Sequence, residues 1–356
     1  MLAQHLPDTI EWSVASTAGP AGAPVIAGQM VVVPLDTGAI AAHQMIDGAP
    51  RWSTPITATQ SLAADDSRVY VASDEALHAL RAADGSVAWR AVLGGAATAP
   101  PLAHAGWVVA AAAGDLIALR ASDGVVLWRK HFGPIEFRPA LDGDLLIASL
   151  VEGRVVAVNL QDGAERWRSE LGASPGEPFT IAGRVYAGTK DKYFYSLFAA
   201  SGRVEDHRRL GAEVRGRVAV NDRHVFFAAM DNMVRAVLRR GGELRWQQGL
   251  PYRPGAGPVV LGDVIVVPGY SDGPLPAFSL ETGAAAGSVN FGRQLIALPV
   301  FTRLSDGRNA VVGITGALDN KWVITLRAQS RVPLIAVQPL TVLPGVVVTL
   351  PQPPAR

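Results

Sequence analysis

The stretch Ala121–Lys130, which reads ASDGVVLWRK, decides the fold because the chain repeats its pattern. An Asp-Gly turn is followed, five residues after the aspartate, by a tryptophan within a short alternation of apolar and polar residues. The same offset from a turn leads to Trp52, Trp89, Trp128, Trp167 and Trp246. A motif that returns at a constant interval indicates a repeat architecture, which has to be recognised before any local pattern is interpreted.

Three irregular copies complete the series. Trp12 has no turn before it, and the turns at 201–202 and 282–283 lead to Asp206 and Gly287 in place of tryptophan. The eight marker positions, from 12 to 287, are separated by 37 to 41 residues throughout. Such a narrow period predicts one continuous array of similar units along most of the 356-residue chain.

Each unit reads as four short strands, and residues 137–170 show this best. An apolar segment and an Asp-Gly turn precede the strands DLLIASLV (144–151) and RVVAVNL (154–160), which are joined by a Glu-Gly hairpin. A second Asp-Gly turn then leads to the closing segment with Trp167. Turns of this kind suit hairpins because glycine accepts a positive φ without a steric penalty. Four antiparallel strands in about forty residues are typical of a propeller blade.

Counting the units predicts an all-β fold, one eight-bladed propeller of four-stranded antiparallel blades over residues 1–330. Residues 288–330 supply three strands, and no strands precede the one around Trp12 to form a blade with it. The economical solution is ring closure, in which the N-terminal strand becomes the outermost strand of the last blade and leaves no exposed sheet edge. The alternative is that Leu334–Leu340 supplies the fourth strand. We expect the proline-rich extension 331–356 to be an extended surface segment that packs on the propeller or on a partner.

Composition limits the classes of partner. There are 32 Lys and Arg against 31 Asp and Glu, so global charge predicts no nucleic-acid partner. Cysteine is absent, which excludes disulfides and thiol catalysis. The apolar runs are too short for a membrane span, and MLAQHLPDTIEW lacks the basic and apolar regions of a signal peptide. We expect a soluble monomer.

The repeat resembles the pyrroloquinoline-quinone-like repeat in LHALRAADGSVAW (77–89), LIALRASDGVVLW (116–128) and VVAVNLQDGAERW (155–167). This resemblance implies an eight-bladed propeller in which each tryptophan docks between neighbouring blades. A flat indole with a single N–H donor suits such a slot. The structural docking residues are then Trp12, Trp52, Trp89, Trp128, Trp167 and Trp246. We expect the contacts at Asp206 and Gly287 to be weaker or differently filled.

Two families share this repeat: the quinoprotein dehydrogenases and BamB, the propeller lipoprotein of the outer-membrane β-barrel assembly machinery. The length and the lack of large insertions are more similar to BamB. That resemblance implies a non-catalytic scaffold whose protein partner is a β-barrel assembly factor, in the periplasm or at the outer membrane. No signal peptide or lipobox cysteine is visible, so the cytoplasm is the alternative location. The alternative functions are a quinoprotein-like enzyme or small-ligand binder that uses the central channel, and a sensor propeller of a signalling system.

The sequence favours a protein without enzymatic activity or cofactor. A quinone enzyme of this family would need a calcium site and a catalytic aspartate, and its relatives are longer and often carry a vicinal disulfide. Here Asp191, Asp231 and Asp319 fall on equivalent hairpin tips of different units, where aspartate commonly forms turns. The seven histidines show no metal-binding spacing, and no phosphate loop or nucleophile elbow is present.

Charged residues gather in the segments that lead into the innermost strand of each unit. We expect their side chains to surround one mouth of the central channel, where guanidinium groups could bind carboxylates or a strand edge of a protein partner. In BamB the partner-binding residues lie in loops of this kind, and an Arg-Gly pair there is echoed by Arg215-Gly216. The alternative is that the arginines are solvated or pair with Glu136, Glu177 and Glu213. The predicted protein-binding residues are Arg138, Arg215, Gly216, Arg217, Arg253 and Arg293.

Overall fold

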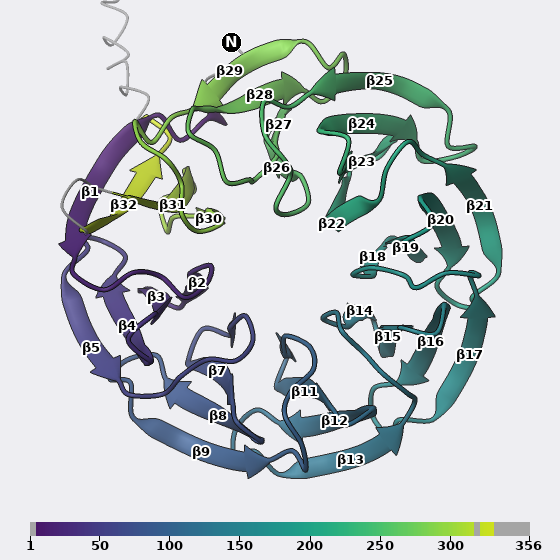
Figure 1. The fold of residues 1–356 in the computed structure, drawn as a ribbon, viewed down its shortest axis with the longest axis horizontal. Coiled ribbons are helices and arrows are strands. Elements are labelled where there is room, and N and C mark those ends of the chain that lie inside the picture. The colour runs from purple at the N-terminus through teal and green to yellow at the C-terminus, as the bar shows by residue number, and fades with distance from the viewer. Residues whose placement is uncertain (1–4, 317–320, 331–356) are drawn as a thin grey trace, which may run out of the picture.

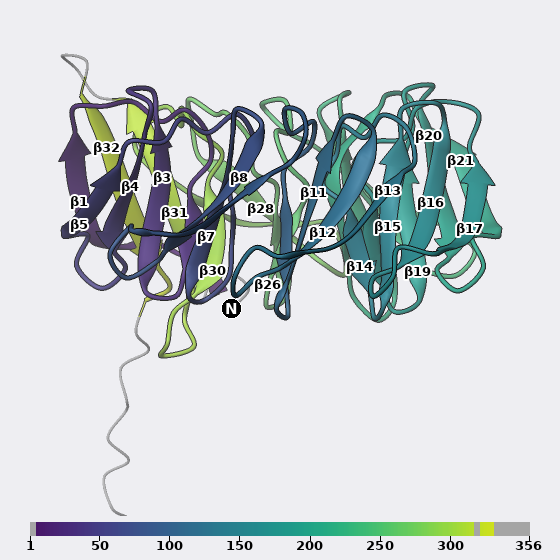
Figure 2. The same cartoon turned by 90° about the horizontal axis from the view of Figure 1, so that it is seen from below.

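Eight four-stranded antiparallel sheets stand in a ring around a central axis (Figure 1). The computed structural model describes residues 5–316 and 321–330, and every element in these ranges is a strand. Seen from the side, the blades form a short, broad disc (Figure 2). Nothing in the described ranges forms a helix long and apolar enough to cross a membrane. The predicted all-β, eight-bladed propeller is confirmed.

The first four blades follow one another along the chain, each from its innermost to its outermost strand. Blade 1 contains β2 (Val25–Ala27), β3 (Met30–Leu35), β4 (Ala39–Gln44) and β5 (Pro50–Thr54). Blade 2 contains β6 (Ala63–Ala64), β7 (Arg68–Ser73), β8 (Ala76–Arg81) and β9 (Val87–Val92). Blade 3 contains β10 (Leu102–His104), β11 (Trp107–Ala112), β12 (Asp115–Arg120) and β13 (Val126–His131). Blade 4 contains β14 (Ala140–Asp142), β15 (Leu145–Leu150), β16 (Arg154–Asn159) and β17 (Glu165–Glu170).

The remaining blades continue in the same way until the last, which takes its outermost strand from the N-terminus. Blade 5 contains β18 (Phe179–Ile181), β19 (Arg184–Gly188), β20 (Tyr193–Phe198) and β21 (Val204–Arg209). Blade 6 contains β22 (Val214–Val220), β23 (His224–Ala229), β24 (Met233–Leu238) and β25 (Leu244–Gly249). Blade 7 contains β26 (Val259–Leu261), β27 (Val264–Val266), β28 (Leu275–Ser279) and β29 (Ala285–Val289). Blade 8 contains β30 (Val300–Arg303), β31 (Asn309–Gly316), β32 (Trp322–Ala328) and β1 (Thr9–Ser16).

The hydrophobic core is a ring of layers between blades. Within one such layer, Val109 and Leu116 of blade 3 pack with Leu146 and Val156 of blade 4, and all four are fully buried. The middle strands are apolar on both faces because each face meets a neighbouring blade, whereas the outermost strand β13 is exposed at every position except Trp128. Each blade is therefore stable only between two neighbours, as in other repeat folds.

The tryptophan of each outermost strand docks onto the next blade. Its indole N–H donates a hydrogen bond to the main-chain carbonyl three residues before the turn glycine of that blade. A side chain on the glycine would collide with the ring: a Cβ at Gly85, which has a φ of +72°, would lie 2.5 Å from Trp52. The tryptophan of one blade and the turn glycine of the next thus form one contact between blades, which we call a seam. The bonds are Trp12 to Met45 (2.8 Å), Trp52 to Ala82 (2.8 Å), Trp89 to Ala121 (2.9 Å), Trp128 to Leu160 (2.6 Å), Trp167 to Ala199 (2.7 Å) and Trp246 to Leu280 (3.0 Å).

The two seams without tryptophan differ from each other. Between blades 7 and 8, where Gly287 stands in the outer strand, the N-terminal residue Leu6 is 3% exposed and packs in one cluster with Ala286 and Val289. Between blades 5 and 6, the carboxylate of Asp206 lies over the turn glycine Gly242. One seam is therefore filled by an apolar side chain from the chain terminus, and the other contains a charged side chain.

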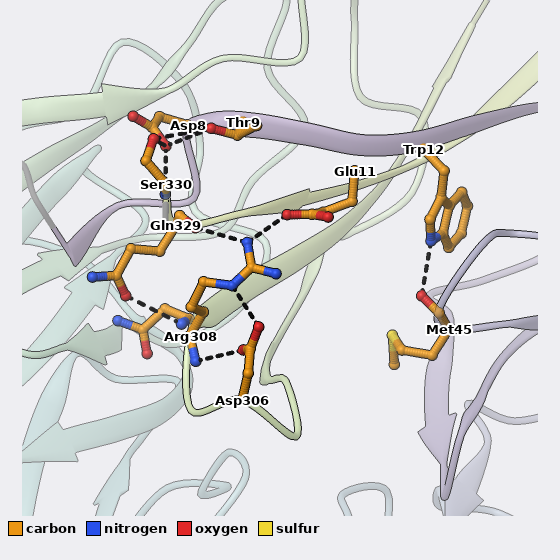
Figure 3. A network of polar contacts seen from close by, with 10 residues as sticks. Asp8, Thr9, Glu11, Trp12, Met45, Asp306, Arg308, Gln329 and Ser330 are labelled. Carbon is orange, nitrogen blue, oxygen red and sulfur yellow. Dashed lines mark hydrogen bonds and ion pairs between the residues drawn. The ribbon is translucent and has the colours of Figure 1, made fainter. Parts of the chain in front are cut away.

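The ring closes between β1 and β32, as predicted. The two strands pair over their length, with Trp12 opposite Leu326. Figure 3 shows the polar contacts of this closure: the Arg308 guanidinium binds Glu11 Oε1 at 2.5 Å, Asp306 Oδ2 at 2.7 Å and the Gln329 carbonyl at 3.0 Å. The fourth strand of blade 8 is thus the N-terminal one. The alternative strand at 334–340 and the rest of the extension 331–356 lie outside the described residues, so the boundary at 330 stays a prediction.

The first prediction concerns Arg308, whose side chain is 12% exposed and joins three segments of the closure. Replacing it by methionine keeps the packing of the stem but leaves the Glu11 carboxylate without its partner. We expect Arg308→Met to lower the free energy of unfolding by about 1.5–3 kcal/mol, the range for hydrogen bonds to charged groups. Urea unfolding measures the change. The control is Arg303→Met, an exposed arginine of the same blade. Equal midpoints for both variants would contradict this role.

The second prediction concerns acid stability. Burial raises the pKa of Asp8, but hydrogen bonds from Ser330 and Thr9 outweigh it, and the pKa lies below its ordinary value. A carboxyl group with a lowered folded-state pKa stabilises the fold above its unfolded-state pKa, and this contribution is lost as pH falls through the folded-state value. We expect the stability difference between the wild type and Asp8→Asn to be largest at neutral pH and to shrink below about pH 4. A pH-independent difference in urea midpoints would refute it.

Candidate functional site

Three charged side chains occupy the same position in three successive blades. In each of these blades, one residue of the innermost strand pairs with the third residue of the neighbouring strand. That residue is Ala140, Phe179 or Ala219. Arg138, Glu177 and Arg217 each stand two positions before it. The innermost strands surround the central axis (Figure 1). All three side chains line one cavity at this axis. We call them the channel triad.

The channel wall is polar on one side only. The triad belongs to blades 4, 5 and 6 and lines a cavity of about 610 Å³. The opposite wall, from blades 1, 2, 3 and 8, is mostly apolar and rich in proline. Its lining segments are residues 23–26, 61–64, 100–103 and 300–302. An occupant of this channel would therefore meet charge on one side and apolar surface on the other.

Arg138 spans the channel. Its Nη2 donates a 3.0 Å hydrogen bond to the main-chain carbonyl of Leu62, which belongs to the opposite wall in blade 2. Burial lowers the pKa of Arg138, and the nearby Glu177 carboxylate counteracts this effect. Its Nε is buried without a hydrogen-bond partner among the described residues. Arginine does not lose its proton in proteins, so Arg138 remains a half-buried cation whose Nε donor is unused.

Glu177 lies between the two arginines. Burial raises the pKa of its carboxyl, and the charges of Arg217 and Arg138 act in the opposite direction. The ion pair with Arg217 is loose, with 3.7 Å between Nε and Oε1, and the Arg217 guanidinium also lies 5.1 Å from the centre of the Phe179 ring. The Arg217 side chain is 48% exposed. The triad thus has two guanidinium groups and one carboxylate, and Glu136 adds a second carboxylate to the same cavity. The loosely paired, half-exposed Arg217 guanidinium is accessible to a second anion.

Two glycines fix the backbone beside Arg217. β22 is longer than its equivalents and shifts register between Arg215 and Ala219, with Gly216 at a φ of +69°. A Cβ on Gly216 would lie 2.3 Å from the Gly257 nitrogen, and a Cβ on Gly257 would lie 1.7 Å from the Arg217 oxygen. Main chain thus contacts main chain between blades 6 and 7. Only glycine fits either position, and the contact holds Arg217 on the channel wall.

The other predicted arginines lie elsewhere or are only partly described. Arg253 and Arg293 are exposed on the loops that lead into β26 and β30, and neither belongs to the channel lining. Arg253 instead lines a separate cavity of about 640 Å³ in blade 7, together with Tyr252 and Tyr270. The backbone of Arg215 pairs with Ala228, and its side chain is not described.

Sequence reasoning placed Glu177 near the arginines but missed its equivalence to them. The signal was present in Arg138-Pro139 and Glu177-Pro178, where the charged residue directly precedes a proline that leads into the innermost strand. The apolar wall opposite could not be found in this way, because it comes from blades that are distant in the sequence.

The described lining does not fit a calcium-dependent quinone site. Calcium takes six to eight oxygen ligands, several of them carboxylates. The channel cavity offers only the carboxylates of Glu136 and Glu177, and Glu177 already faces two arginines. In residues 5–316 and 321–330 there is no group of three or more His, Cys, Asp or Glu side chains arranged to hold a metal ion.

A family model described as outer membrane protein assembly factor BamB matches residues 38–181 and 153–313. The chain belongs to this family. The predicted resemblance to BamB is thereby confirmed. A search of curated proteins returns no match to the chain.

Solved structures show the same fold at low sequence identity. BamB from Moraxella catarrhalis is 20% identical, with a TM-score of 0.70 over 88% of this chain and 98% of that one. The computationally designed protein Ika8 is 15% identical, with a TM-score of 0.74 over 90% and 99%. The quinohemoprotein alcohol dehydrogenase ADHIIG from Pseudomonas putida is 14% identical, with a TM-score of 0.69 over 97% and 79%. Since an assembly factor, a designed protein and an enzyme share this fold, the fold does not distinguish between their functions.

The third prediction separates steric contact from backbone strain at Gly216. Gly183 has a similar φ of +74° but open space where a side chain would point. We expect Gly183→Ala to lose roughly 1–2 kcal/mol of stability from the left-handed conformation alone. Gly216→Ala should lose a further 1–3 kcal/mol or so, because the methyl group overpacks the contact with blade 7. Chemical denaturation compares the two, and equal losses would show that this contact does not constrain β22.

Proposed function

We propose that this protein is a non-catalytic scaffold in outer-membrane protein assembly that binds a protein partner through the loops of the channel mouth. Membership of the BamB family supports the role in assembly, and a location in the periplasm or at the outer membrane. The observation that carries the proposal is the half-exposed guanidinium of Arg217, which is only loosely paired with Glu177 on the channel wall.

The partner chemistry follows from the triad. A carboxylate from the partner can pair with the Arg217 guanidinium in a bidentate manner, which the loose contact to Glu177 does not achieve. Arg215 and Gly216 adjoin this position, and the exposed Arg253 and Arg293 lie on equivalent loops further around the ring. Arg138 contributes from within the channel, where its hydrogen bond to Leu62 holds it in place. We therefore propose an acidic, extended segment of the partner as the group recognised.

A quinone enzyme is the rival that the test has to exclude. The channel lining favours the scaffold over such an enzyme. The Glu177 carboxylate, which would have to bind calcium, lies between two arginines. The same fold supports enzymes, so direct reconstitution is required.

The fourth prediction is that reversing the charge of Arg217 weakens binding of the protein partner. The intact protein should recover an outer-membrane assembly factor from an envelope extract of the source cells, identified by mass spectrometry. We expect Arg217→Glu to weaken binding to that factor at least about tenfold, because breaking a hydrogen-bonded charge pair costs 2–5 kcal/mol. Arg245→Glu, an exposed charge reversal on the outermost strand of the same blade, should bind as the wild type does. Circular dichroism confirms that both variants fold.

Two outcomes would contradict the proposal. Equal binding by Arg217→Glu and the wild type would remove the site from the channel mouth. Cofactor absorbance together with alcohol-dependent dye reduction, after reconstitution with pyrroloquinoline quinone and calcium, would overturn the non-catalytic role.

A further inference from the structure

The seam between blades 5 and 6 lacks the indole that fills the regular seams. Asp206 of β21 pairs with Ser196 at the position where Trp167 of β17 and Trp246 of β25 pair with alanine. Its carboxylate and the Arg208 guanidinium lie where an indole ring would be, since a Cβ on the turn glycine Gly242 would be 2.2 Å from Asp206 Oδ2 and 2.4 Å from Arg208 Nη2. The backbone is thus arranged to receive an indole, and the sequence provides a much smaller side chain.

The missing ring leaves a cavity of about 120 Å³ between the two blades. Its apolar lining comes from Tyr186 and Phe194 of blade 5 and from Val225 and Val237 of blade 6. The Tyr186 and Phe194 rings lie within 9° of parallel, with 6.1 Å between their centres. An apolar cavity of about 150 Å³ in an engineered protein binds benzene. The cavity between blades 5 and 6 has apolar walls as well, but its rim carries Glu205, Asp206, Arg208 and Arg239. This space is suited to a flat aromatic ring.

Two polar groups at this seam could contact a bound indole: a main-chain carbonyl and a tyrosine hydroxyl. In the six regular seams the acceptor is the carbonyl three residues before the turn glycine, and here that carbonyl belongs to Arg239. The Tyr186 hydroxyl is buried in a side chain that is 2% exposed, and its polar neighbour is the Arg239 side chain. An occupant with an N–H donor would satisfy a main-chain acceptor, and the hydroxyl adds a second polar contact.

The rim carries as many carboxylates as guanidinium groups, Glu205 and Asp206 against Arg208 and Arg239, and so favours a neutral occupant. Glu205 is paired with Arg184, with 2.5 Å between Oε2 and Nε, and Asp206 is paired with Arg208 at 3.4 Å. The Asp206 side chain is 39% exposed and that of Arg208 is 28% exposed, so both can turn toward solvent. An entering ring would then take the place over Gly242 that indoles occupy at the regular seams.

We infer that the seam between blades 5 and 6 is a binding site for a neutral, planar aromatic ring with an N–H donor, of the indole type. The ring can belong to a free small molecule or to a tryptophan side chain of a partner. This inference is independent of the channel mouth, because none of its residues lines the channel cavity.

Indole itself is the probe for the test. Binding to the folded state raises the unfolding temperature in proportion to the logarithm of ligand concentration. We expect indole to stabilise the wild type, and Asp206→Ala to bind at least about threefold more tightly. The reason is that one of the two side chains over Gly242, Asp206 and Arg208, has then been removed. Asp206→Trp should unfold at a higher temperature without ligand and should show no further response to indole. N-acetyl-tryptophanamide, tested in parallel, distinguishes a side chain from a free indole as the natural occupant.

Location is measured in the wild type, so that the test holds even if Asp206→Trp fails to fold. Isotope-filtered NMR should show contacts from indole protons to the methyl groups of Val225 and Val237. Three results would overturn the inference: contacts only to methyl groups elsewhere, equal responses of Asp206→Trp and the wild type, or no binding by Asp206→Ala up to the solubility limit of indole.

Discussion

The docking of one blade's indole onto the turn glycine of the next is the contact on which this ring depends. A single four-stranded blade cannot bury both of its apolar faces, and the seams are where neighbouring blades are held in register. The N-terminal segment serves two seams in succession: Leu6 fills the one between blades 7 and 8, and Trp12 binds the Met45 carbonyl of blade 1. The strand that completes blade 8 therefore also closes the ring onto blade 1 (Figure 3).

The fold could be predicted from the sequence because one repeated motif contains both parts of a seam, the turn glycine and the tryptophan. The glycine of a turn receives the tryptophan of the preceding blade, so a repeat of about forty residues specifies neighbours as well as strands. What fills the irregular seams could not be predicted in the same way. Leu6 comes from the opposite end of the chain from Gly287, and the open space beside Asp206 depends on how Tyr186 and Phe194 pack.

The channel site was predictable only in outline. The sequence placed charged residues at the segments before the innermost strands, but their exact register came from the strand pairing, which aligns Arg138, Glu177 and Arg217. In blades 7 and 8 the equivalent position is occupied by Gly257 and Leu298, so Arg253 and Arg293 lie outside the charged wall. The triad connects three blades and reaches a fourth through Leu62, which makes it a structural element of the channel as well as the proposed contact for a partner.

Native-state hydrogen exchange, followed by mass spectrometry on the free protein, tests most directly whether the indole controls each seam. Local opening is fastest where few apolar contacts protect the backbone. The account predicts that peptides from both sides of the seam between blades 5 and 6, residues 204–209 and 238–243, exchange faster than their equivalents at 165–170 and 198–203, which meet at the Trp167 seam. Equal protection at the two seams would contradict the central role of the indole.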